Sequence, residues 1–228
     1  MSTVTLSKNT LSILKNFSNL NSNILIKPGN VIKTITHSNN SMAIATLEET
    51  FDVEVGINDL HEFLGITSLF VNPTYDFGTK SVKIKDGNTH SLAVVHYASP
   101  SVLKYPTKDV IMPQVNVGIL LTEKQFTELQ KASSVMKLPD LSFTVDSGSI
   151  VAMVSDLSNP TTNTYKVVVE NSWTGPNFQF NFKMEYIKIL PGDYTINFAK
   201  NVVGEFVNKN IPLKYWFAME ANTSKYGS

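Results

Sequence analysis

The feature that most limits how this chain can fold is an amphipathic helical pattern that occurs twice, in residues 6–21 and again in residues 121–137. In each segment the apolar residues gather on one half of a helical wheel, which predicts a helix that packs against a core. Ser7 and Thr122 are predicted N-caps, and Gln125 completes a capping box with Thr122. The apolar faces are formed by Leu11, Ile13, Leu14, Phe17 and Leu20 in the first segment, and by Phe126, Leu129, Ala132, Val135 and Met136 in the second.

The segments that follow the two helices also correspond. Residues 23–36 and 141–156 each hold two apolar runs about a glycine, Gly29 or Gly148, and each predicts a β-hairpin. Equivalent segments lie 115, 119 and 127 residues apart as the chain proceeds, so the second copy has longer loops. The pattern therefore predicts a duplicated, β-rich architecture.

Each copy continues with a strand and a short helix. Alternation predicts strands in FDVEV at 51–55 and in FQFNF at 178–182. A helix is predicted over 56–66, where Asp59 and Glu62 have capping-box spacing and Gly65 provides the stop; its counterpart, 183–194, would end at Pro191-Gly192.

Between the two copies, residues 99–116 show no sustained period and contain three prolines, which predicts an extended connector. We therefore expect an α+β, β-rich fold of two similar domains, residues 1–110 and 111–228, each with two helices on antiparallel sheets. The tail residues 193–200 and 213–220 are predicted to supply the closing strands.

The charges indicate what the helices could face. The chain has no net charge and no cysteine, and all 19 of its basic residues are lysine. Without arginine, any phosphate contact must be loose and insensitive to base sequence. On the first helix the polar face has Lys8 and Lys15 and no acid, and on the second it has Lys124, Lys131 and Lys137 with Glu123 as its one acid. Two faces of one sign favour an anionic partner, although ordinary solvated surface helices remain the alternative.

Four strings in this order resemble the sliding clamps of T4-like bacteriophages: LSKNTLSILKNFSNLNSNILIKPG, FDVEVGINDLHEFLGI, FNFKMEYIKILPGDYTINFAKN and YWFAMEANTS. The likeness runs over nearly the whole chain and is strongest at about 6–66 and 140–200. It implies sliding-clamp (DNA clamp) domains and a homotrimeric ring lined by helices. Such a ring encircles double-stranded DNA without reading its sequence and tethers the replicative DNA polymerase. It is placed by an ATP-driven clamp loader, also serves late transcription, and catalyses nothing.

The resemblance also implies site residues. The DNA-facing (pore) candidates are Lys8, Lys15 and Asn19 on the first helix, Lys124, Lys131 and Lys137 on the third, Lys188 on the fourth and, with less support, His61 on the second. The candidates for a partner-peptide pocket are Val110, Ile111, Met112, Pro113 and Met219, and packing at the domain junction is the alternative. The edge strands expected to join neighbouring chains are Ser91–Tyr97 and Thr164–Glu170.

Other classes of function have less support. The four histidines lack metal-ligand spacing, and no nucleophile elbow, Walker loop or dinucleotide fingerprint occurs, so we expect no enzyme, metal or cofactor. A β-rich structural or assembly protein with duplicated domains and no DNA role remains the main alternative. The N-terminus lacks the apolar core of a signal peptide, and no apolar run is long enough to span a membrane. We therefore expect the cytoplasm of the infected bacterial host.

Overall fold

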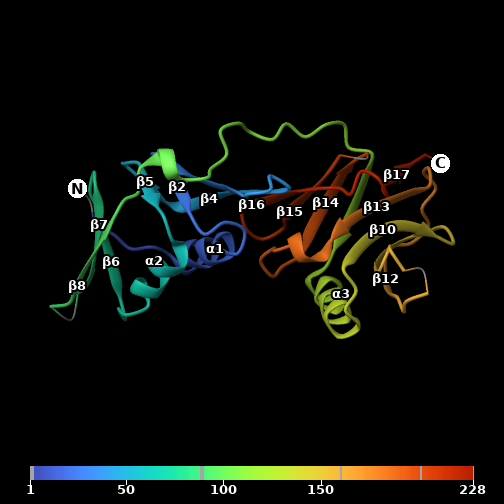
Figure 1. The fold of residues 1–228 in the computed structure, drawn as a ribbon, viewed down its shortest axis with the longest axis horizontal. Coiled ribbons are helices and arrows are strands. Elements are labelled where there is room, and N and C mark those ends of the chain that lie inside the picture. The colour runs from blue at the N-terminus through green and yellow to red at the C-terminus, as the bar shows by residue number, and fades with distance from the viewer. Residues whose placement is uncertain (1–2, 88–89, 160, 201, 228) are drawn as a thin grey trace. The chain divides into compact units, whose positions relative to one another are not determined.

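A computed structural model describes residues 3–87, 90–159, 161–200 and 202–227. The chain divides into two compact units, Met1–Asp109 and Val110–Ser228, which are called unit 1 and unit 2 below (Figure 1). The described residues are mostly in β-strands and include three α-helices.

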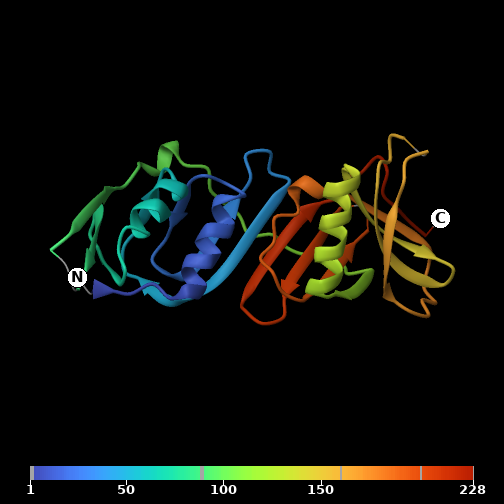
Figure 2. The ribbon, with the colours of Figure 1, turned by 90° about the horizontal axis from the view of Figure 1, so that it is seen from below.

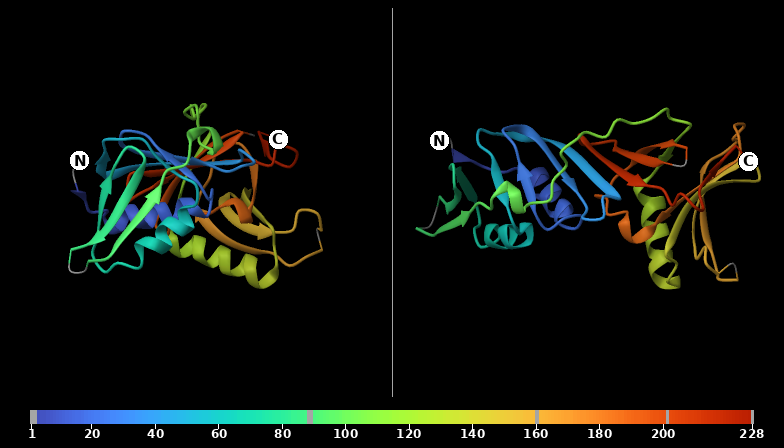
Figure 3. Two further views of the ribbon diagram at one scale, coloured as in Figure 1. Left: turned by 60° about the vertical axis from the view of Figure 1, so that its left-hand side comes forward. Right: turned by 45° about the horizontal axis from the view of Figure 1, so that its top comes forward.

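Unit 1 is built from antiparallel strands and two helices. Its sheet has the strand order β1-β6-β7-β8, and Figure 3 shows β6, β7 and β8 running side by side. Two further ladders pair β2 with β5 and β3 with β4. The elements are β1 (Thr3–Val4), α1 (Lys8–Ser18), β2 (Ile24–Ile26), β3 (Gly29–Ile35), β4 (Ser41–Phe51), β5 (Val55–Ile57), α2 (Leu60–Thr67), β6 (Pro73–Phe77), β7 (Ser81–Asp86), β8 (Leu92–His96) and the 3₁₀ turn η1 (Pro100–Val102).

Unit 2 contains one α-helix and two antiparallel arrays. Strands β9, β14, β15 and β16 are neighbours in that order, and a five-stranded sheet has the order β12-β11-β10-β13-β17. The elements are β9 (Val117–Leu121), α3 (Glu123–Met136), β10 (Asp140–Asp146), β11 (Ser149–Ser155), β12 (Tyr165–Glu170), β13 (Phe178–Lys183), the 3₁₀ turn η2 (Met184–Tyr186), β14 (Tyr194–Ala199), β15 (Val203–Asn208), β16 (Leu213–Ala218) and β17 (Lys225–Tyr226).

The two units repeat one pattern of strand pairing. The order β1-β6-β7-β8 in unit 1 corresponds to β9-β14-β15-β16 in unit 2. The pairs β2–β5 and β3–β4 likewise correspond to β10–β13 and β11–β12. Helices α1 and α3 occupy equivalent places in the two series, each following the first strand of its unit. The internal repeat seen in the sequence is therefore a repeat of topology.

Each unit has its own apolar core. In unit 1, α1 lies beside β4 and α2 (Figure 2), and it buries Leu14 and Phe17 almost completely. The core of unit 2 is rich in phenylalanine. Phe198 lies 5.0 Å from Phe143 and 5.1 Å from Phe180 between ring centroids, and both partners are fully buried. Burial of such aromatic side chains removes a large apolar area from water and is a main source of stability.

The hairpin predicted at residues 23–36 is wrong. Strands form on both sides of Pro28-Gly29, but β2 pairs with β5 and β3 pairs with β4. Two-residue hairpin turns need a positive φ at their first central residue, whereas proline fixes φ near −65°. Gly29 has a φ of 120° and turns the chain between two ladders. The equivalent hairpin of β10 and β11 is confirmed, because Ser147 and Gly148 both have positive φ, as a type I′ turn requires.

The predicted strand at 51–55 is also wrong. Phe51 ends β4 and Val55 begins β5, and the chain bends between them. Phe51 and Val55 are both buried, which explains why apolar residues alternate in the sequence here. The two residues nevertheless belong to different ladders, because β4 pairs with β3 and β5 pairs with β2. A bend is needed because one straight strand cannot belong to both ladders. The predicted strands at 178–182 and in the tail are confirmed as β13, β14 and β16.

Of the two short helices, one is confirmed. Asp59 caps α2 by accepting the N–H groups of His61 and Glu62, although Gly65 lies inside the helix and the end falls at Ser68. The helix predicted over 183–194 is wrong, because only the single turn η2 forms there. The backbone of Leu190 is bound by side chains instead: its N–H donates to the Tyr215 hydroxyl, and its carbonyl accepts from the Tyr194 hydroxyl.

Candidate nucleic-acid interface

Helix α1 presents its predicted lysines to solvent. Ser7 is confirmed as the N-cap, because its Oγ accepts the N–H of Thr10 at 3.1 Å. Lys8, Lys15 and Asn19 are all exposed. The helical wheel also places Asn16 on the polar half of this helix, but in the structure Asn16 is buried.

A carboxylate from another strand closes the N-terminus of α1. Glu49, in β4, accepts the backbone N–H of Ser7 through Oε1 and the hydroxyl of Thr10 through Oε2, the latter at 2.5 Å. Burial acts to raise the pKa of Glu49, but these hydrogen bonds outweigh it and hold the pKa below its ordinary value. The first turn of α1 has no acid of its own. Glu49 therefore supplies the negative charge that favours a helix N-terminus.

Helix α3 is positioned by the predicted capping box, in which Thr122 and Gln125 bind each other's backbone N–H groups. Phe126 and Leu129 are its buried residues. The predicted apolar face is too wide, because Val135 is 82% exposed near the end of the helix. The exposed lysines of α3 and of its left-handed C-cap are Lys124, Lys131 and Lys137.

Two acids modify the expected charge of α3. Glu128 lies four residues after Lys124 and three before Lys131, so the lysine row is interrupted by an acid that the sequence interpretation left out. Its carboxylate is 3.5 Å from the Tyr165 hydroxyl of β12. At the N-terminus, Asp193 accepts the backbone N–H of Glu123 at 2.8 Å. Glu49 and Asp193 were both missed, because they lie far along the chain from the residues whose N–H groups they accept: 42 residues separate Glu49 from Ser7, and 70 separate Asp193 from Glu123.

The lysines of the two long helices are free of ion pairs, unlike five other lysines. Within the described ranges, no carboxylate lies within 4.0 Å of the Nζ atoms of Lys8, Lys15, Lys124, Lys131 and Lys137, whereas Lys33, Lys85, Lys166, Lys183 and Lys214 are paired. A lysine without a fixed partner keeps its charge and its side-chain freedom for a phosphate.

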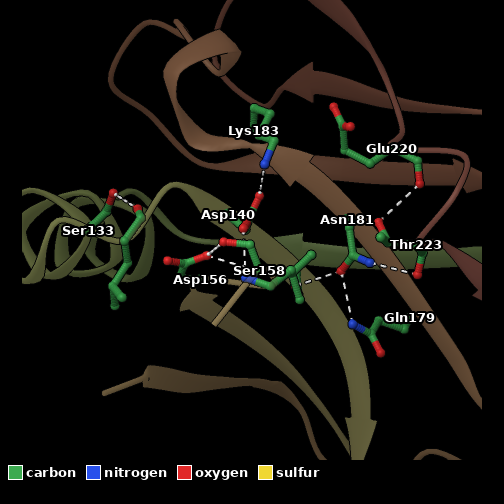
Figure 4. Close-up of polar contacts among 12 residues, drawn as sticks. Ser133, Asp140, Asp156, Ser158, Gln179, Asn181, Lys183, Glu220 and Thr223 are labelled. Carbon is green, nitrogen blue, oxygen red and sulfur yellow. Dashed lines mark hydrogen bonds and ion pairs between the residues drawn. The ribbon is translucent and has the colours of Figure 1, made fainter. Parts of the chain in front are cut away.

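Lys183 is not one of the unpaired lysines, because its ammonium group forms an ion pair with Asp140 (Figure 4). Lys183 Nζ lies 2.5 Å from a carboxylate oxygen of buried Asp140. This hydrogen bond is the main cause that raises the pKa of Lys183. In the same view, buried Asn181 donates to the carbonyl of Thr223, which fixes the C-terminal segment on β13. Asn181 also accepts a hydrogen bond from the hydroxyl of Ser142. The network is structural, because its polar groups bind one another.

The remaining pore candidates lie beside the short elements. His61 is exposed on α2, and its Nδ1 is 3.4 Å from Ser18 Oγ at the end of α1. It lines a groove of about 590 Å³ with Lys15. Lys188 is exposed but stands after η2 and not on a fourth helix, and it lines a groove of about 480 Å³ with Lys137. Each unit thus has a groove between its long helix and the element equivalent to α2.

The residues predicted for the partner-peptide pocket differ in their exposure. Met219 is 6% exposed and its N–H donates to the carbonyl of Val202. Ile111 is 88% exposed, and Val110, Met112 and Pro113 lie with it in the irregular connector. Residues 99–116 are confirmed as a connector without strands, apart from the short turn η1. The pocket stays a prediction.

The predicted edge strands are at edges. β8 ends the four-stranded sheet of unit 1, and β12 ends the five-stranded sheet of unit 2. Each exposes apolar side chains, including Leu92 and Val94 on β8 and Val168 on β12. An unpaired strand edge can add a strand from another chain.

Two other kinds of functional feature are absent from the described part of the chain. No group of three acidic or histidine side chains there could hold a metal ion. None of its helices is both long and apolar enough to cross a membrane.

Comparison with solved structures defines the class to which this fold belongs. Proliferating cellular nuclear antigen from Thermococcus kodakaraensis superposes with a TM-score of 0.72 at 10% identity, covering 96% of this chain and 99% of that one. The Entamoeba histolytica protein of the same name gives 0.67 at 13% identity, covering 92% and 94%. The fold is therefore that of the sliding clamps.

Comparison of sequences shows which sliding clamps this chain resembles. Residues 7–102 match the family model described as DNA polymerase processivity factor. A sliding clamp of Vibrio phage KVP40 is 28% identical over 220 residues, covering 95% of this chain and 99% of the relative. The sliding clamp of Enterobacteria phage T4 is 29% identical over 225 residues, covering 96% and 98%. The resemblance of this chain to the sliding clamps of T4-like phages is confirmed.

Proposed function

We propose that three copies of this protein close into a ring around double-stranded DNA and tether the replicative DNA polymerase of a phage. A clamp loader would open and place the ring in the host cytoplasm, and the loaded ring would also serve phage late transcription. The protein would act by encirclement and not by catalysis. The clamp role is supported by the relatives, which are named sliding clamps, and by the match to a family model described as DNA polymerase processivity factor. The loader and late-transcription roles are proposed from the resemblance of the sequence to the clamps of T4-like phages.

The observation that carries the proposal is the repeated pair of long helices. α1 and α3 occupy equivalent places in two units of one topology, and each presents exposed lysines without ion-pair partners. Three chains would bring six such helices to one inner wall. A neutral protein can hold DNA in this way, because retention depends on closure of the ring and not on high affinity.

The chemistry of the lysines suits movement along DNA. A lysine ammonium is a mobile point charge that attracts phosphate without fixing a geometry. Salt screens such contacts over about 8 to 10 Å, so each one is weak. Weak contacts that do not depend on base sequence allow a ring to pass from one phosphate to the next.

The first test is the mass of the assembly in solution, measured by analytical ultracentrifugation. We expect a species of three 25.3 kDa chains that persists on dilution to micromolar concentration. The edge strands β8 and β12 would join neighbouring chains, so Val94→Lys on β8 and Val168→Lys on β12 should dissociate it. A monomer at every concentration would contradict the ring and favour a structural protein with duplicated domains.

The second test changes the charge of the helix faces. The quadruple variant Lys8→Glu, Lys15→Glu, Lys124→Glu and Lys131→Glu should keep the fold and the trimer. It should lose at least roughly tenfold in loader-dependent stimulation of polymerase on primed circular DNA, because repulsion replaces attraction at each phosphate.

The matched control for that variant reverses the same number of charges, at four exposed lysines outside the helices: Lys80→Glu, Lys200→Glu, Lys209→Glu and Lys225→Glu. It should keep nearly full stimulation. Equal loss in the control and in the quadruple variant would refute the assignment of the helix faces to DNA.

A further inference from the structure

Both long helices have their N-termini closed by a carboxylate from elsewhere in the same unit. Glu49 reaches α1 from β4, and Asp193 reaches α3 from the residue before β14. Each carboxylate accepts a backbone N–H at the start of the helix, in addition to the Ser7 or Thr122 cap. The two contacts come from non-equivalent residues in the two units, but they reach the same end of equivalent helices.

The N-terminus of a helix is a natural binding site for phosphate, because its free N–H groups and its dipole both favour an anion. On a helix whose side chains approach DNA, this end would offer a directional contact to the phosphate backbone. Such a contact is stronger than one from a flexible lysine, since charge-assisted hydrogen bonds to fixed backbone donors have defined geometry.

We infer that Glu49 and Asp193 act as internal anions that occupy the N-termini of α1 and α3 and so keep phosphate from binding there. The inference rests on the proposed function for its consequence, which is that the ring moves along DNA without being held at any one phosphate. The role is specific to these two carboxylates among the acids near the helices. Within the described part of the chain, the one hydrogen bond to the side chain of Glu48, the neighbour of Glu49, comes from the side-chain amide of Asn9, at 3.0 Å.

The geometry at Glu49 supports this role. One oxygen accepts the Ser7 N–H and the other the Thr10 hydroxyl, so both oxygens are engaged by the first turn. These hydrogen bonds favour the charged form of Glu49 and hold its pKa below the ordinary value. At α3 the 2.8 Å contact of Asp193 with the Glu123 N–H lies beside the Glu123 side chain, which adds a second negative charge to the first turn.

The first experiment does not require DNA. Inorganic phosphate is titrated into Glu49→Ala, Asp193→Ala, Glu48→Ala and the unsubstituted protein, and the backbone amide signals of Ser7 and Glu123 are followed by NMR. We expect saturable shifts of Ser7 only in Glu49→Ala and of Glu123 only in Asp193→Ala. Shifts of equal size in Glu48→Ala would overturn the inference, because they would reflect lost negative charge alone.

The second experiment measures movement on DNA. Labelled rings are loaded on long duplexes, and their diffusion coefficient is recorded as a function of salt. We expect Glu49→Ala and Asp193→Ala each to slow diffusion by roughly two- to fivefold at low salt, the size expected from a helix-terminus charge, with Glu48→Ala near the unsubstituted protein. Unchanged diffusion in both variants would overturn the inference.

Two further controls distinguish loss of charge from loss of helix, and failure of this inference from failure of the proposed function. The isosteric variants Glu49→Gln and Asp193→Asn replace the alanine variants if circular dichroism shows loss of helix. They remove the charge and keep one acceptor, so they should give smaller effects in the same direction. If the unsubstituted protein does not load on DNA at all, the proposed function fails, whereas the phosphate titration still decides whether the carboxylates occupy the helix ends.

Discussion

Units 1 and 2 share most of their strand pairing, although unit 2 adds the pairs β10–β11 and β13–β17. They also differ in the element that follows β5 in unit 1 and β13 in unit 2. Unit 1 has the helix α2 there, capped by Asp59, and unit 2 has only the single turn η2 without a side-chain cap. In unit 2 the hydroxyls of Tyr194 and Tyr215 bind the backbone of Leu190. The comparison teaches that the ladders define the repeat, whereas a helix can be replaced when side chains satisfy the backbone groups that it would have paired.

The units also differ in how their cores are packed. Phe198 in unit 2 is fully buried and lies within 6.1 Å of three phenylalanine rings, counted between centroids. Phe63 in unit 1 has one aromatic neighbour, Tyr75, at 6.2 Å. The free energy of unfolding should therefore depend more strongly on Phe198 in unit 2 than on Phe63 in unit 1.

The largest expected effect tests this difference in packing. Phe198→Ala should lower the free energy of unfolding by about 3–5 kcal/mol, because it leaves a cavity at the centre of the cluster. Phe63→Ala should cost less, at about 3 kcal/mol. Urea denaturation at constant m-value measures both. A greater loss in Phe63→Ala would show that the cores do not differ as described.

A smaller effect tests the contact that replaces the second helix in unit 2. Tyr215→Phe removes the hydroxyl that accepts the Leu190 N–H at 3.1 Å and leaves that donor unsatisfied, which should cost about 1–2 kcal/mol of unfolding free energy. Tyr186→Phe, at an exposed hydroxyl on η2, is the control and should stay within about 0.5 kcal/mol. Equal effects of the two changes would mean that the tyrosine contact does not hold this segment.

The smallest effect concerns Glu49 and acid. Its pKa in the folded chain lies below the ordinary value of 4.5, so its contribution to stability is present above that pH and is lost as pH falls through the folded pKa. Glu49→Gln should flatten the acid limb of a plot of stability against pH. The change should be less than about 1 kcal/mol, because solvent screens this partly exposed group. Identical acid limbs in Glu49→Gln and in the unsubstituted protein would contradict the role given to Glu49.

Much of the fold could be predicted from local patterns. The long helices and their caps were predictable because Ser7, Thr122 and the apolar residues that follow lie within one or two turns of each other. The β10–β11 hairpin was predictable because Ser147-Gly148 determines its own turn. The same reasoning failed at Pro28-Gly29, because the partner of β2 is β5, about 30 residues along the chain.

The candidate site was predicted in part. The exposed lysines were found from the helical period, but Asn16 and Val135 departed from it, because burial depends on what packs against each helix. Lys188 was placed on a helix that does not form, since the tyrosines that bind the backbone of Leu190 lie 4 and 25 residues further along the chain. Glu49 and Asp193 were beyond local patterns, because their contacts arise only when distant strands meet a helix end.

The central claim is that the chain holds DNA by closing around it, and one measurement tests it most directly. The ring is loaded on nicked circular DNA, the salt is raised to screen the lysine contacts, and the half-life of the complex is recorded before and after a single cut that linearises the circle. We predict a long half-life on the circle and rapid loss from the linear form, where the ring can leave over the ends. Equal half-lives on both forms would contradict encirclement.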